Sequence, residues 1–237
     1  MVFLTVWGVS QMVLPVSEGE WGVAHCLFWG IVYLGIVGTA LPLYIARKYN
    51  LAMSDPDVPA KRFIIGTAAL LIAAGVGVFM SGSFDRVMEL RPPAAVVFKY
   101  LLLFAPMAAA LTLHCLFLVP AAVTGALGGH NGAMSFAIVV SALSMGLGFL
   151  VDSGFASTEN AVTMTVLGLL FGTGAVLTRS VYLTAFVFFL VMLSNTLADG
   201  KYNDYPWYAA VTGFALWALL LLVAAASRMS REKNADN

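Results

Sequence analysis

The chain has 237 residues, of which 61% are hydrophobic and only 10% are charged, and its formal net charge is zero. A soluble domain carries about 25% charged residues, so the composition excludes an ordinary soluble protein. The lack of charge clusters argues against nucleic acid as a partner, because phosphate recognition requires a basic patch. We therefore expect an integral membrane protein.

Long apolar runs divide the chain into predicted membrane spans. A helix needs about 20 apolar residues to cross a hydrocarbon core of about 30 Å, and the runs lack the alternation, about ten residues long, that marks β-barrel strands. We expect an all-α, polytopic bundle of about seven transmembrane helices in one domain, residues 1–237. The predicted spans are Gly22–Ala46, Phe63–Ser83, Ala95–Ala122, Ala133–Val151, Ala161–Thr178, Val181–Ala198 and Trp207–Ala226.

The first sixteen residues, MVFLTVWGVSQMVLPV, are apolar but short. As a helix they would reach about 24 Å, which is less than a comfortable span. No basic n-region or small-residue cleavage site indicates a signal peptide. Pro15 and the acidic SEGE that follows indicate an abrupt end. We expect an interfacial or re-entrant segment, with an eighth span as the alternative.

Arg179 is the only charged residue between Glu159 and Asp199. This stretch is long enough for two spans of about 20 residues each. We therefore predict a turn near Thr178–Ser180, and one long tilted helix is the competing interpretation.

The distribution of basic residues predicts which side of the chain faces the cytoplasm. Lys and Arg near span ends are enriched on that side. If Glu18 and Glu20 lie outside, the inner segments carry eight of the 12 basic residues and four of the 12 acidic residues. The net charge of the inner segments is then +4, and that of the outer segments is −4. We expect an N-terminus outside and a cytoplasmic C-terminus, in a bacterial inner or plasma membrane. The inner basic residues are Arg47, Lys48, Lys61, Arg62, Arg179, Arg228, Arg231 and Lys233.

Polar side chains near the outer ends of several spans form a candidate ligand-binding site. Polar and ionisable groups within a membrane are costly and usually face the bundle interior or a cavity. We therefore predict an outward-facing vestibule whose residues are His25, Lys99, Asp152, Asn195 and Asp199. The alternative is that helix ends are ordinarily polar, and that Lys99 and Asp199 extend to the interface.

The histidines and cysteines do not predict a metal or haem site. The depths of His25 and His114 differ by about 20 Å, from a rise of 1.5 Å per residue, which is too far apart for two ligands of one haem iron. Cys26 and Cys115 are separated in the same way, so we expect no disulfide. His114 is expected to bond a backbone carbonyl, and His130, in the sequence GALGGHNG, to be an exposed loop residue.

No catalytic motif is present, and the last span has no lysine for retinal, which excludes a microbial rhodopsin. One remaining hypothesis is a small-solute or ion permease, or a component of one. The other is a membrane anchor or accessory subunit of a larger complex, including a redox or quinone-linked one. A permease predicts polar residues that line a water-filled path, whereas a subunit predicts that they pair internally. Expected partners are the lipid bilayer and membrane subunits or further copies of the chain; the cofactor is unknown.

Overall fold

The computed structural model describes residues 28–80, 93–128, 130, 132–151, 158–199 and 207–235. The first sixteen residues and two site candidates, His25 and Asp152, lie outside these ranges. The described elements, in chain order, are the π-helix η1 (Phe28–Ala40), α3 (Leu41–Lys48), α4 (Ala60–Met80), α6 (Ala94–Leu111), the π-helix η2 (Thr112–Leu118), α7 (Val119–Ala126), α8 (Ala133–Val151), α9 (Thr158–Thr178), α10 (Val181–Asp199) and α11 (Trp207–Ala235).

The described residues confirm the all-α architecture. A helix lies in each of the seven predicted segments. Four of the described helices are long and apolar enough to cross a membrane: Ala60–Met80, Ala94–Ala126, Ala161–Thr178 and Val181–Ala198. Shorter apolar helical stretches lie in α8 and α11. The count of seven spans and their orientation stay predictions.

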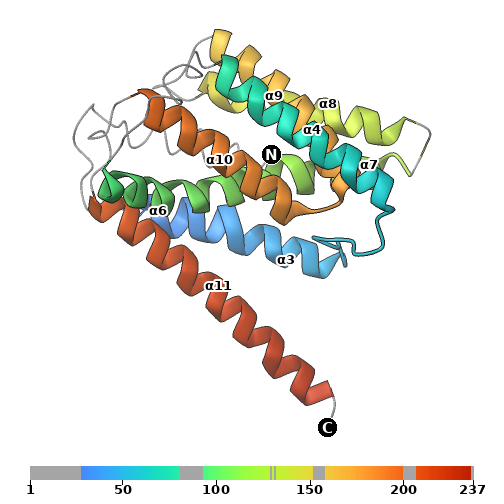
Figure 1. Ribbon diagram of the computed structural model, residues 1–237. Helices are drawn as coiled ribbons and strands as arrows, with labels where there is room; N and C mark the ends of the chain where they lie inside the picture. The colour runs from blue at the N-terminus through green and yellow to red at the C-terminus, as the bar shows by residue number, and fades with distance from the viewer. Residues whose placement is uncertain are drawn as a thin grey trace.

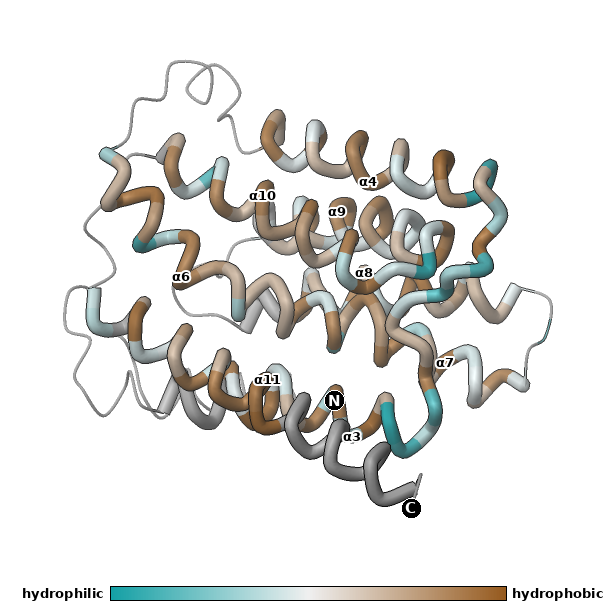
Figure 2. Tube along the Cα trace, turned by 60° about the horizontal axis from the view of Figure 1, so that its bottom comes forward, coloured by the Kyte–Doolittle hydropathy of each residue, from teal (hydrophilic) through white to brown (hydrophobic). Residues whose placement is uncertain are grey.

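Most of the described helices pack side by side in one bundle, and α11 runs obliquely away from it toward the C-terminus (Figure 1). α9 packs against both α4 and α8, whereas α11 packs along η1 and α6. α10 contacts both α4 and α6 and so joins these two groups. Figure 2 shows a mainly hydrophobic band along the helices, with hydrophilic residues gathered toward their ends. This distribution suits helices whose middle parts lie in hydrocarbon.

α4 and α8 approach α9 closely at glycine residues. A Cβ atom on Gly66 would lie 2.8 Å from the backbone nitrogen of Thr178 and 2.8 Å from Leu177 Cβ. A Cβ atom on Gly168 would lie 2.7 Å from Ala142 Cα. Small residues allow membrane helices to approach and gain van der Waals contact. α9 therefore packs closely on both α4 and α8.

The predicted turn between α9 and α10 is confirmed. α9 ends at Thr178 and α10 begins at Val181, with Arg179 in the left-handed region at a φ of 48°. Arg179 Nη1 donates to Asp55 Oδ2 at 2.6 Å, and this hydrogen bond holds the pKa of the Asp55 carboxyl below its usual value. The backbone N–H of Val181 donates to the carbonyl of Met53 at 3.0 Å. The loop after α3 and this turn therefore lie at the same end of the bundle, as the placement of the basic residues predicted.

Each π-helical segment ends just before an α-helix whose second residue is proline. These prolines are Pro42 in α3 and Pro120 in α7. A π-helix bonds each carbonyl to the N–H five residues later, but proline has no N–H. The carbonyls of Val37 and Cys115, five residues before the prolines, therefore lack a π-helical partner. Side chains of other elements donate to both carbonyls.

Candidate functional site

Lys99 lies in the second turn of α6. Among the described site candidates, it is the residue whose burial is expected to cost the most free energy. Its side chain is only 4% exposed, and Nζ lies 5.0 Å from the centroid of the Tyr100 ring. An ionisable group in an apolar span is unfavourable, and the face of an aromatic ring attracts a cation. This burial is contrary to the alternative that Lys99 extends to the interface.

Tyr100 anchors the helix at this point. It is fully buried and stacks on Phe104 with ring centroids 5.5 Å apart. Both rings belong to a core cluster that joins α6, α10 and α11. Its buried members are Tyr100, Leu103, Phe104, Leu197 and Ala210. Because these large side chains are packed from three helices, the backbone that carries Lys99 is held in place.

Asn195 and Asp199 lie near the end of α10. Asn195 Nδ2 donates to the carbonyl of Gly77 on α4 at 3.4 Å. Leu197 packs against α6 instead, because residues two positions apart lie on nearly opposite sides of a helix with 3.6 residues per turn. The side chain of Asp199 lies outside what the structure describes. Lys99 and Asn195 are therefore at the same end of two contacting helices, α6 and α10.

A second group of polar contacts joins the π-helical segments and was not among the predicted site residues. His114 Nε2 lies 2.6 Å from the carbonyl of Val37, and because a carbonyl only accepts, Nε2 carries the hydrogen. This contact confirms the prediction for His114. Ser141, fully buried on α8, donates to the carbonyl of Cys115. The prolines five residues after Val37 and Cys115 are the sequence signal that could have identified both acceptors.

Thr112, the first residue of η2, differs from several other helical threonines in the hydrogen bonding of its hydroxyl. Its side chain is 1% exposed, and its hydroxyl has no hydrogen-bond partner within the described part of the chain. A buried hydroxyl without a partner costs about 1–3 kcal/mol. The threonines that instead donate to the carbonyl four residues earlier include Thr124, Thr165, Thr173 and Thr178. Because π-helical turns often lie at functional sites, η2 is a second candidate region.

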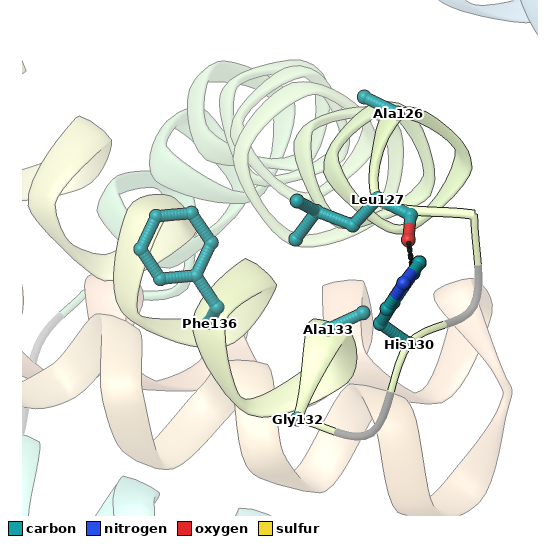
Figure 3. Close-up of a pocket in the computed structure, with 6 residues that line it drawn as sticks. All are labelled: Ala126, Leu127, His130, Gly132, Ala133 and Phe136. Atoms are coloured by element: carbon teal, nitrogen blue, oxygen red, sulfur yellow. Dashed lines mark hydrogen bonds between the residues drawn. The ribbon is translucent and has the colours of Figure 1, made fainter.

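A shallow pocket of about 530 Å³ lies at the turn between α7 and α8 (Figure 3). His130 is exposed there, and its Nδ1 donates to the carbonyl of Leu127 at 2.6 Å. The pocket is about 40 Å along the helix from Lys99, at 1.5 Å per residue, so it is not part of the predicted outer site. The residues that line it are Ala126, Leu127, His130, Gly132, Ala133 and Phe136.

The described residues contain no group of three His, Cys, Asp or Glu side chains arranged to hold a metal ion. Compared with protein-family models, with curated proteins and with solved structures, the chain gives no match. Its function is therefore inferred from the contacts described above.

Proposed function

We propose that the chain is a seven-span membrane protein with a cytoplasmic C-terminus, and that it acts as a permease for a small solute or ion, or as a component of one. The burial of Lys99 in an apolar helix is the observation that supports this most. Asn, Ser and His bonded to carbonyls are ordinary contacts between membrane helices. A buried ionisable residue costs much more and is typical of an ion or substrate path.

The helix that carries Lys99 is also irregular. Pro106 interrupts the backbone bonding of α6, and η2 follows within the same continuous helix. Interrupted helices line the binding sites of many transporters. His114 lies about 22 Å further along this helix than Lys99, at 1.5 Å per residue. The proposed outer site consists of His25, Lys99, Asp152, Asn195 and Asp199.

Cysteine accessibility tests for a water-filled path whatever the substrate is. Cys26 and Cys115 are first replaced by serine. Lys99 is buried in this structure, so a permease must open a path to it; Lys99→Cys and Asn195→Cys are then expected to react, in the conformation open to the outside, with a charged, membrane-impermeant methanethiosulfonate reagent. Leu103→Cys, in the core cluster of the same helix, is the control and should not react. Protection of both outer positions would contradict the permease.

Ion flux tests the role of the Lys99 charge directly. Lysine and arginine line the paths of anion pores, so chloride entering proteoliposomes that contain a chloride-quenched dye is the first probe. Lys99→Met should abolish most of the flux, whereas Lys99→Arg should retain it because the charge is kept. Equal chloride fluxes in liposomes with the wild type, in liposomes with Lys99→Met and in empty liposomes would contradict a role of the Lys99 charge in ion flux.

A second function, an anchor or accessory subunit of a larger membrane complex, is favoured by a different observation. His114, Ser141 and Asn195 all bond to carbonyls of neighbouring helices, which is the internal pairing that a subunit predicts. Purification in mild detergent, followed by a visible spectrum and identification of co-purifying chains, tests this function. A coloured or multi-subunit preparation in which cysteines at positions 99 and 195 do not react would favour it over the permease.

A further inference from the structure

The loop between α3 and α4 pairs with the α9–α10 turn (Figure 1). This loop, residues 51–59, is termed the strap. Ser54 of the strap and Ser180 of the turn form an antiparallel β-bridge. On either side of this pair, one backbone N–H of the strap donates to the turn at 3.1 Å, and one of the turn donates to the strap at 3.0 Å. Two backbone hydrogen bonds thus fix the strap on the turn.

The strap lies at the opposite end of the bundle from Lys99. η1 and α6 run in the same direction, because η1 contacts α6 and α3 contacts η2. His114 meets the carbonyl of Val37 near the middle of both. Lys99 lies about 22 Å before His114 along its helix, whereas the strap begins about 20 Å after Val37, at 1.5 Å per residue. The strap also crosses from α3, which packs on η1, to α4, which packs on α9.

The contacts that hold the strap can open at little cost. None of its residues is buried, so little apolar surface is exposed when it detaches. The side chains of the Arg179–Asp55 ion pair are 53% and 25% exposed, and such pairs contribute little in water. Segments with few buried apolar contacts and exposed backbone hydrogen bonds open locally without unfolding of the whole protein.

Two features of the closed strap are themselves unfavourable. Arg62, at the start of α4, donates Nη2 to the carbonyl of Val176 at 3.0 Å, but its buried Nε has no hydrogen-bond partner among the described residues. The hydrogen bond from Arg179 and, to a smaller extent, the charge of Arg62 hold the pKa of the Asp55 carboxyl below its usual value, so Arg62 lies near the strap. Arg179 also adopts a left-handed φ of 48°, which is strained for a residue with a side chain. Access of water to Nε and relaxation of this φ both favour an open strap.

We propose that the strap is the inner gate of the permease, closed in this structure, and that it detaches from the α9–α10 turn to connect the path with the cytoplasm. This inference rests on the proposed function and orientation. Transporters with alternating access open their site to one side at a time, so the end opposite Lys99 needs a gate. α4 and α9 stay together in this motion, because they pack closely at Gly66 beside the strap.

A disulfide between the strap and the turn tests the gate. The two hydrogen bonds flank Ser54 and Ser180, and the Cα atoms of such a pair lie about 4.5 Å apart, which suits a disulfide. In a chain whose native cysteines are serine, Ser54→Cys with Ser180→Cys should cross-link on oxidation. Most of the chloride flux into proteoliposomes should then be lost, and a reductant should restore it. The two single variants are the controls, and the oxidant should not change their flux.

A double variant that forms no disulfide would contradict the pairing, and one that keeps its flux when cross-linked would overturn the gate while leaving the permease intact. Absence of chloride flux in the wild type would instead count against the proposed function. Hydrogen exchange then still decides whether the strap opens, because it requires no transport.

Exchange of the full-length chain, measured by NMR, compares the amides of Asp55 and Val181 with those of Leu70 and Phe171 in the middle of α4 and α9. Asp55 and Val181 should exchange at similar rates, because one opening frees both. A disulfide should slow both about 30-fold or more and leave the two control amides unchanged. Protection of Asp55 and Val181 as strong as that of Leu70 in the wild type would show a permanent connection and would overturn the gate.

Discussion

Replacing Gly66 with alanine tests the close approach of α4 and α9. The new Cβ would lie 2.8 Å from the backbone nitrogen of Thr178 and 2.8 Å from Leu177 Cβ. A backbone atom cannot move aside as the end of a flexible side chain can, and overpacking of this kind costs about 1–3 kcal/mol. Alanine also favours a helix over glycine by about 0.5–1 kcal/mol, which offsets part of this cost.

Gly75→Ala, on the same helix, is the matched control because its Cβ would meet no atom within 4 Å. The helix preference is the same at both positions. The difference in unfolding free energy between the two variants therefore isolates the packing cost, about 1–3 kcal/mol. Unfolding from mild detergent into SDS, followed by circular dichroism, measures it. Equal stability of Gly66→Ala and Gly75→Ala would refute the close contact between α4 and α9.

The hydrogen bond from Arg179 lowers the pKa of the Asp55 carboxyl below its ordinary value of 3.8. The stabilisation by this hydrogen bond is therefore fully present above pH 3.8 and is lost as the pH falls through the lowered pKa. The distribution of distances between spin labels on the loop after α3 and on the α9–α10 turn should broaden in acid in the wild type, and already at neutral pH in Asp55→Asn. A wild-type distribution that does not change with pH would contradict this. His114→Leu removes the bond to the carbonyl of Val37 and should lower stability to SDS by about 0.6–2 kcal/mol, and an unchanged unfolding curve would mean that this contact contributes nothing. A cysteine at Ser227 should be labelled only from the cytoplasmic side, and labelling from outside would reverse the proposed orientation.

Much of the helical architecture could be predicted from the order of apolar and polar residues. α8 begins at Ala133 and ends at Val151, as predicted, because a Gly-rich loop precedes it and a charged residue follows it. The turn after Thr178 could also be predicted, since a lone arginine between two apolar runs favours a position outside hydrocarbon. These boundaries depend on local composition, so the sequence is sufficient to locate them.

The candidate site was predictable only in part. Lys99 and Asn195 stand out by residue type, but their burial and the partner of Asn195 depend on how α4, α6 and α10 pack. A carbonyl partner was predicted for His114, but the identity of that partner and the bond from Ser141 to Cys115 were not, because a π-helical segment is not visible in the hydropathy of the chain. The prolines at 42 and 120 are visible, but they indicate only which carbonyls lose a partner, not which side chains of other helices replace it.

By itself, the sequence determined that the chain is helical and rich in membrane-compatible segments, where α8 and the turn after α9 lie, and which residues are costly in hydrocarbon, because these properties follow from each segment's own length, charge and apolarity. The tertiary structure alone decided that α9 packs on both α4 and α8, that the loop after α3 meets the α9–α10 turn, and that His114 bonds Val37. Such pairings depend on which surfaces fit closely enough to gain van der Waals contact and to satisfy buried polar groups. They join residues far apart in the chain, which local pattern does not specify.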